Sequence, residues 1–218
     1  MTDIIQTIAI WALPVIFAIT LHEAAHGYAA KYFGDFTAYA QGRISLNPLR
    51  HIDMMGTIVV PLMLLLLSKF FGGGILFGWA KPVPVNFSAL RHPKKDMLWV
   101  AAAGPGANFI MAMFWALVLK LALSMPESGY TLPMGLMGKA GIQINIVLMV
   151  LNLLPLPPLD GGRIAVSLLP HRLSYSYARI EPYGMIILLL LLFSGILGLI
   201  LWPPVSGLMQ LISSVFNL

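Results

Sequence analysis

The 218-residue sequence predicts an all-α polytopic membrane protein, with about five transmembrane helices, one re-entrant segment and a few short β-strands. Composition is the first ground for this prediction, because 59% of the residues are hydrophobic and only 10% are charged, whereas about 25% are charged in a soluble domain. The second ground is a series of apolar stretches with about the 20 residues that a helix needs to cross a bilayer. We therefore expect one membrane-embedded domain, residues 1–218, with no second large domain.

The predicted spans follow one another along the chain, separated by loops with basic, proline and glycine residues. Four apolar stretches have the length of a span: residues 4–32, 97–123, 136–154 and 182–202. Pro203-Pro204 is then expected to break the helix. The final stretch, 205–218, has apolar residues at helical spacing, and its length favours a helix in the membrane interface over one that crosses. We place the core at about 4–165 and the C-terminal helices at 182–218.

The first apolar stretch carries three ionisable residues, spaced as His22-Glu23-x-x-His26. Ionisable groups inside a span are costly and need partners. Residues four apart lie on one face of a helix, so the two histidines can hold one metal ion with Glu23 beside it. A metal site needs a third protein ligand. Asp160 is the candidate that stands out, because it follows a span that breaks at "NLLPLPPLDGGR" (152–163), and broken backbone is tolerated at membrane depth when it lies inside protein.

These motifs resemble those of the site-2 proteases, a family of intramembrane zinc metalloproteases. The resemblance includes "HEAAHGYAA", "GRISLNPLRHID" (42–53), "FGWAKPVPVNF" (77–87) and "AGPGANF" (103–109), and it covers about residues 15–165. It is to a compact form without the PDZ or other accessory domain that many members carry. It implies a zinc-dependent endopeptidase that cleaves transmembrane or membrane-proximal segments of membrane proteins, as in regulated intramembrane proteolysis.

The resemblance also implies roles for individual residues. It implies one Zn²⁺ per chain, whose ligands would be His22, His26 and Asp160. Glu23 would be the catalytic acid–base that activates the zinc-bound water. Asn152 would contact the backbone of the substrate, and Asn108 would line the substrate-binding site.

Other interpretations of the same residues stay open at this point. Asp160 precedes two glycines and would also suit a turn. Asn108 would also suit a polar link between packed helices, and Asn145 is expected to serve helix packing. The alternative function classes are a membrane metal transporter and a non-catalytic protein that binds membrane helices. A transporter would need ligands along a path and an internal repeat, which we do not find in the sequence, and a non-catalytic binder would not need Glu23.

A shared metal ion constrains how the chain crosses the membrane. The histidines lie toward the C-terminal end of the first span, and Asp160 lies beyond the C-terminal end of the span at 136–154. These two ends must be on the same side, so one of the segments between them does not cross. The segment 56–71 is short, contains Pro61 and is followed by Gly72-Gly73-Gly74. We therefore predict that this segment is re-entrant.

The basic residues predict the orientation. In the re-entrant topology, 11 of the 13 Lys and Arg residues fall on one side, and only Lys120 and Lys139 fall on the other. The positive-inside rule makes the first side cytosolic. We therefore expect a multi-pass protein of the plasma (inner) membrane, with its N-terminus outside and its active site near the cytosolic face. This orientation accounts for the net charge of +5, and no nucleic-acid partner is expected.

The expected partners are the lipid bilayer and a transmembrane protein or peptide substrate. The stretches "YAQGRISLNPL" (39–49) and "WAKPVPVNF" (79–87) look extended, and they favour short β-strands near the active site. An exposed strand edge there would be able to hold a substrate segment in extended form by β-augmentation.

Overall fold

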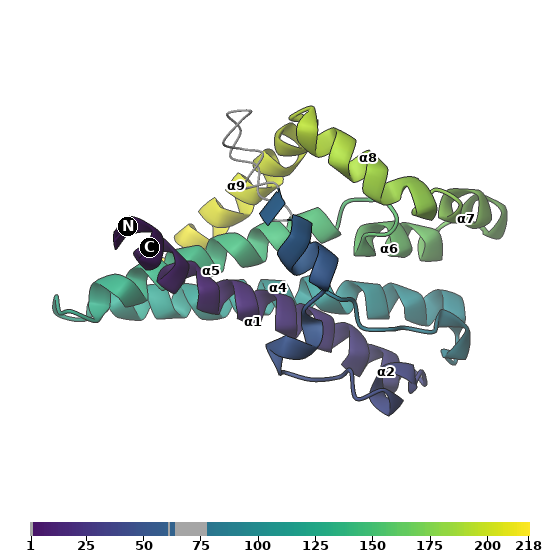
Figure 1. The fold of residues 1–218 in the computed structure, drawn as a ribbon, viewed down its shortest axis with the longest axis horizontal. Helices are drawn as coiled ribbons and strands as arrows, with labels where there is room; N and C mark the ends of the chain where they lie inside the picture. Colours follow the sequence, from purple (N-terminus) through teal and green to yellow (C-terminus); the bar gives the residue numbers. More distant parts are fainter. Residues whose placement is uncertain (1, 61, 64–77) are drawn as a thin grey trace.

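The computed structural model describes residues 2–60, 62–63 and 78–218, which form helices joined by turns (Figure 1). Among these residues, four helices are long and apolar enough to cross a membrane. They are α1 (Thr2–Tyr32), α4 (Pro93–Ser124), α5 (Thr131–Asn152) and α9 (Ile196–Phe216). The helices α7 (His171–Ala178) and α8 (Glu181–Phe193) are bent by 62° relative to each other and would make a fifth span as a pair. An all-helical protein with several apolar spans is therefore confirmed.

Shorter elements connect the long helices. In the described residues between α1 and α4 lie α2 (Thr37–Ala40) and the short helical turns η1 (Pro48–His51), η2 (Met54–Val59) and η3 (Phe87–Ala89). After α5, a turn leads into α6 (Asp160–Leu168).

The helices α1, α4 and α5 pack together as the centre of the molecule (Figure 1). α4 and α5 form an antiparallel hairpin in which Trp115 and Leu119 of α4 are buried. Gly138 and Gly141 of α5 allow this close approach, because a Cβ atom on Gly141 would lie 2.1 Å from Cγ of Trp115. Small residues at the contact are the usual way for membrane helices to pack closely.

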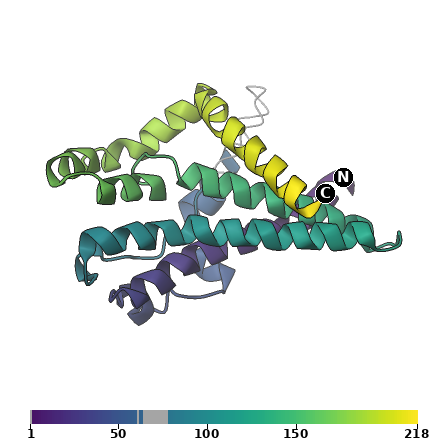
Figure 2. The ribbon, with the colours of Figure 1, turned by 180° about the vertical axis from the view of Figure 1, so that it is seen from behind.

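The two ends of this bundle differ. The N- and C-termini lie close together at one end, whereas α2, α6, α7 and the start of α4 lie at the other, and both views show this (Figures 1 and 2). α1 and α5 therefore run in the same direction, antiparallel to α4. Their C-terminal ends share one end of the bundle, as a metal ion held jointly by α1 and Asp160 requires.

Residues 79–81, which precede α4, lie against residues 51–56 of η1 and η2. The N–H of Trp79 donates to the carbonyl of Gly56 at 3.1 Å, and the N–H of Lys81 donates to the carbonyl of His51 at 2.9 Å. The two ends of the intervening segment therefore lie side by side, which is what the re-entrant prediction requires. Most of the segment itself, including the predicted glycine turn, lies outside the described residues.

The short β-strands predicted at 39–49 and 79–87 are not seen among the described residues. The first stretch instead contains the end of α2, a turn and the start of η1. The second stretch is extended, but Pro82 and Pro84 have no N–H to donate to a ladder, and the N–H of Val83 donates to a side chain. Several backbone donors of this segment are thus missing or already used, which disfavours a sheet.

The C-terminal region also differs from the prediction. The helix break expected at Pro203-Pro204 is wrong, because both prolines lie inside α9, and a membrane helix tolerates proline when neighbouring groups satisfy the freed carbonyls. The chain breaks instead at Gly195, whose φ of +77° favours glycine. The stretch 205–218, expected to lie in the interface, is therefore mostly the second half of a helix of 21 residues that is long enough to span.

Candidate metal centre

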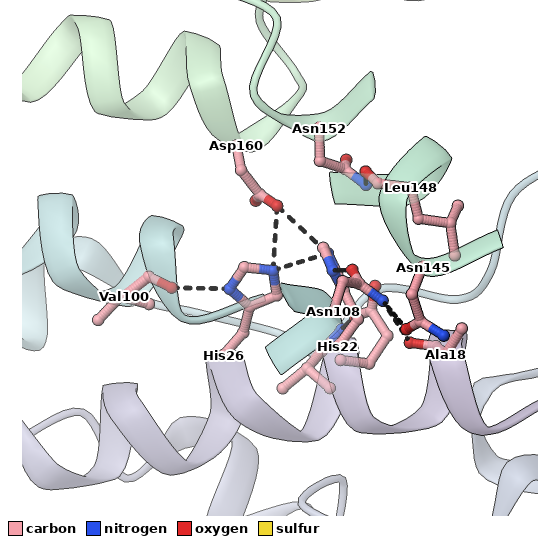
Figure 3. Close-up of polar contacts among 11 residues, drawn as sticks. Ala18, His22, His26, Val100, Asn108, Asn145, Leu148, Asn152 and Asp160 are labelled. Atoms are coloured by element: carbon pink, nitrogen blue, oxygen red, sulfur yellow. Dashed lines mark hydrogen bonds and ion pairs between the residues drawn. The ribbon is translucent and has the colours of Figure 1, made fainter. Parts of the chain in front are cut away.

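Three side chains that can bind a metal ion meet between α1 and α6 (Figure 3). His22 and His26 lie one turn apart on α1, and Asp160 is the first residue of α6. The two Nε2 atoms are 3.1 Å apart, and Oδ2 of Asp160 lies 3.2 Å from Nε2 of His22 and 3.3 Å from Nε2 of His26. This is the one such cluster in the described part of the chain, and its members are the three predicted ligands.

A hydrogen bond at Nδ1 fixes the protonation of each imidazole. Nδ1 of His26 lies 2.7 Å from the carbonyl oxygen of Val100. A carbonyl can only accept, so Nδ1 carries a proton, and in the neutral ring the lone pair is therefore on Nε2. Nδ1 of His22 lies 2.6 Å from Oδ1 of Asn108, which places the same requirement on that ring. Both Nε2 lone pairs are therefore available to a metal ion.

The direction of the bond from His22 is fixed by a chain of buried amides. Nδ2 of Asn108 donates to the carbonyl of Ala18 at 3.2 Å and to Oδ1 of Asn145 at 2.9 Å, and Nδ2 of Asn145 donates to the carbonyl of Gly141 at 2.8 Å. Both carbonyls only accept, so each amide can be oriented in one way only. Asn108 and Asn145 are completely buried. Partners of this kind set the tautomer and the orientation of a ligating histidine.

The donor atoms fit a tetrahedral metal ion. Ligands about 2.0 Å from zinc at tetrahedral angles are about 3.3 Å from one another, close to the separations of 3.1–3.3 Å observed here. Oδ2 of Asp160 is buried and has no hydrogen-bond partner among the described residues. Three lone pairs thus face one another inside the protein, and a cation would offset the cost of burying them together.

Gly104 of α4 makes room for both imidazole rings. A Cβ atom at this position would lie 2.3 Å from Nε2 of His26 and 2.6 Å from Cε1 of His22. The backbone of α4 therefore forms one wall of the metal centre, and any larger residue would push the rings out of place.

Gly161 and Gly162 place the third ligand. A Cβ atom on Gly161 would lie 2.3 Å from the carbonyl oxygen of Leu153, and one on Gly162 would lie 2.3 Å from the nitrogen of Pro157. The first turn of α6 thus packs directly on the backbone of the turn that precedes it. This packing turns Asp160 back toward α1.

Glu23 lies on α1 next to His22 and outside the cluster of donor atoms. Its Oε2 accepts a hydrogen bond from the N–H of Val83 at 2.8 Å. A second carboxylate holds the same extended segment, because Oδ2 of Asp35 accepts from the N–H of Asn86 at 2.7 Å. The segment 79–87 therefore runs along α1 and passes directly beside Glu23.

The chain is similar to known metalloproteases over most of its length. It is 37% identical over 212 residues to "Putative zinc metalloprotease YwhC" of Bacillus subtilis (strain 168). The aligned residues make up 94% of this chain and 91% of that protein. It is 30% identical over 196 residues to "Putative zinc metalloprotease Rip2" of Mycolicibacterium smegmatis, over 89% of this chain and 69% of that protein. The family described as "Peptidase family M50" matches residues 124–194. This chain belongs to peptidase family M50. No solved structure matches it.

In this M50 peptidase, Asn152 lies at the edge of the metal centre. It is the last residue of α5, and it lies on the same side of the centre as Asp160 (Figure 3). Its side chain is half-buried, and Nδ2 donates to the carbonyl of Leu148 at 3.0 Å. This position keeps the predicted contact with a substrate available.

Asn108 is placed differently from the prediction. The sequence suggested that it lines the substrate-binding site, but its side chain is fully buried behind His22 and its hydrogen bonds go to protein groups. Asn145, expected to serve helix packing, belongs to the same network. The available signal was that polar residues inside apolar spans need partners. The sequence could not show that Asn108 and Asn145 are partners of each other.

Proposed function

We propose that this M50 peptidase is a zinc-dependent endopeptidase that cleaves transmembrane or membrane-proximal segments of membrane proteins. The observation that carries the proposal is the convergence of three buried donor atoms, at tetrahedral spacing, within a bundle of apolar helices. His22, His26 and Asp160 would hold one Zn²⁺ per chain. When bound, zinc supplies a Lewis acid for the peptide carbonyl and for the attacking water.

Glu23 is the acid–base of the proposed reaction. The N–H of Val83 engages Oε2, which leaves Oε1 to take a proton from the attacking water. The same carboxyl then gives that proton to the leaving amine nitrogen, so one residue acts first as base and then as acid. The bond to Val83 supports this role because it restricts the direction in which the carboxylate faces.

The two asparagines take separate roles in the proposal. Asn108 is a positioning residue, because it contacts His22 and is closed off from any substrate. Asn152 contacts the substrate backbone, because it is half-buried and lies on the same side of the metal centre as Asp160. A transmembrane substrate must first unwind locally, since its carbonyls are engaged in helical hydrogen bonds, and the amide of Asn152 would be a partner for one of the freed groups.

We further propose that the protein lies in the plasma (inner) membrane with its N-terminus outside and the metal centre near the cytosolic face. Basic residues are concentrated in the segments at the α2 and α6 end of the bundle, as the positive-inside rule expects for a cytosolic side. Single cysteines at Ser45, Ser88 and Ser128 test this in a chain without cysteine. An impermeant thiol reagent outside should label only Ser128→Cys, and labelling of Ser45→Cys or Ser88→Cys from outside would overturn the orientation.

A metal transporter is less well supported. Transport needs ligands along a path, and the described residues contain a single cluster of metal-binding side chains. A non-catalytic binder would give no role to Glu23, which lies next to the metal centre.

Mass spectrometry of membrane peptides from cells with the wild type or Glu23→Gln tests the proposed function. Fragments of membrane proteins should appear only with the wild type, while the variant retains its zinc. The proposal fails if the two samples give the same fragments, because a transporter or a binder would not depend on this carboxylate for cleavage.

A further inference from the structure

A cavity lined by basic residues lies outside the metal centre. It has a volume of about 610 Å³ and is formed by the end of α2, by η1 and by the start of the segment 79–87. Three of its lining side chains are cationic, namely Arg43, Arg50 and Lys81, and no acidic residue lines it. None of the metal ligands takes part, so the cavity is a separate feature.

The three positive charges are not compensated by carboxylates. None of them forms an ion pair among the described residues. The acidic residues nearby in the sequence are already engaged, since Asp35 accepts from the N–H groups of Thr37 and Asn86, and Asp53 accepts from the N–H of Gly56. Three cations around one concave surface create a positive potential that attracts anions.

Backbone carbonyls hold the two guanidinium groups at the wall of this cavity. Nη2 of Arg43 donates to the carbonyls of Lys81 and Pro82 at 3.1 and 3.2 Å, and Nη1 of Arg50 donates to the carbonyl of Gly42. Nε of Arg43 is buried and has no hydrogen-bond partner among the described residues. Carbonyl partners position a guanidinium group without neutralising it, and such a group matches a phosphate through paired N–H donors.

The rim of the cavity is apolar. Leu49 and Ile52 line it with 71% and 40% of their surface exposed. A cationic floor beside exposed apolar side chains matches a ligand with an anionic head and an apolar tail. We infer that this cavity binds a phosphate group, carried either by an anionic phospholipid or by a soluble phosphate compound. The apolar rim favours the phospholipid, and basic pockets on the cytosolic side of membrane proteins bind such headgroups.

The occupied cavity would also hold the segment beside Glu23. Lys81 lines the cavity, Arg43 binds the carbonyls of Lys81 and Pro82, and the next residue is Val83, whose N–H reaches Glu23. A bound phosphate would keep Arg43 and Lys81 together. Amide hydrogen exchange in residues 79–87 should therefore slow when the ligand binds.

Binding to the full chain in a neutral detergent tests the inference. The protein is titrated with short-chain phosphatidylglycerol, with phosphatidylcholine of the same chain length and with inorganic phosphate at constant ionic strength, and the complexes are counted by native mass spectrometry. The clean variant is Lys81→Gln, because this side chain is exposed and donates no hydrogen bond to any residue that the structure describes. Its matched control is Lys95→Gln, an exposed lysine at the start of α4 that does not line the cavity.

We expect phosphatidylglycerol to bind more tightly than phosphatidylcholine, and Lys81→Gln to weaken it about fivefold. Lys95→Gln should bind as the wild type does, and Arg50→Gln should repeat the loss seen with Lys81→Gln. Binding of inorganic phosphate without binding of phosphatidylglycerol would identify a soluble phosphate compound as the ligand, and binding of phosphatidylglycerol in preference to phosphatidylcholine would identify the lipid. Equal weakening by Lys81→Gln and Lys95→Gln, or no preference for either anion, overturns the inference. Binding needs no turnover, so this result is independent of the proposed proteolysis.

Discussion

The metal centre has a buried side and an open side, and the two are built differently. On the buried side, the ring nitrogens of His22 and His26 are held by Asn108 and by a backbone carbonyl. On the open side, Glu23 and Asn152 are half-buried, and each is placed by a hydrogen bond to a backbone group. The groups that fix the metal ligands are thus closed to substrate, whereas those proposed for proton transfer and substrate contact can be reached.

The largest loss of zinc affinity should come from filling the space between α4 and the imidazole rings of His22 and His26. Gly104→Ala would place a Cβ atom within 2.6 Å of both imidazoles, and because packed interiors do not yield by such distances, the rings must move. We expect zinc affinity to fall about 100-fold or more, as measured by competition with a chelator.

The matched control for this change lies two residues away in the same helix. A Cβ atom on Gly106 would meet nothing within 4 Å, so Gly106→Ala should bind zinc as the wild type does. Equal zinc loss in the two variants would show that helix α4, and not the space behind the rings, is what the substitution disturbs.

A smaller loss should follow from removing the amides that orient His22. Asn108→Ala removes the partner of Nδ1, and loss of such a partner costs about 10–100-fold in metal affinity. Asn145→Ala leaves Asn108 beside His22 but removes the group that fixes the orientation of the Asn108 amide. We therefore expect zinc affinity to fall by less than about tenfold. Zinc titration of both variants gives the order. A larger loss in Asn145→Ala than in Asn108→Ala would contradict the proposed network.

The smallest effect on the metal should come from the open side. Asn152→Ala should retain zinc, because Asn152 contacts no ligand, and should lower kcat/KM for a membrane substrate by about tenfold. Zinc content and cleavage are measured on the same preparation. Normal turnover with normal zinc would remove Asn152 from the substrate site.

The metal ligands and Glu23 could largely be predicted from the sequence. The spacing of His22, Glu23 and His26 places them together on any helix, because four residues make about one turn. Asp160 could be recognised because an acidic residue beside a broken span is costly in a membrane unless it has a partner. The histidines and Asp160 can share a metal ion only if the C-terminal ends of their two spans lie on the same side of the membrane. This requirement predicted that one segment between the spans turns back, and the hydrogen bond of Trp79 with Gly56 agrees with that prediction.

The buried side could not be predicted in the same way. Whether Asn108 faces His22 or a substrate depends on how α4 is rotated against α1 and α5, and a sequence does not specify that rotation. Nothing local in the sequence shows that the imidazoles of His22 and His26 lie against Gly104. The break at Pro203-Pro204 was wrong for a related reason, since proline ends a helix in water more often than in a membrane.

X-ray absorption spectroscopy at the zinc edge tests the central claim most directly, which is that His22, His26 and Asp160 hold one zinc ion. The purified chain should contain about one zinc per molecule, with nitrogen and oxygen neighbours at about 2.0–2.1 Å and no sulfur. The imidazole signal should correspond to two rings, and Asp160→Ala should lose most of the metal. A zinc site with an unchanged spectrum and full occupancy in Asp160→Ala would contradict the account.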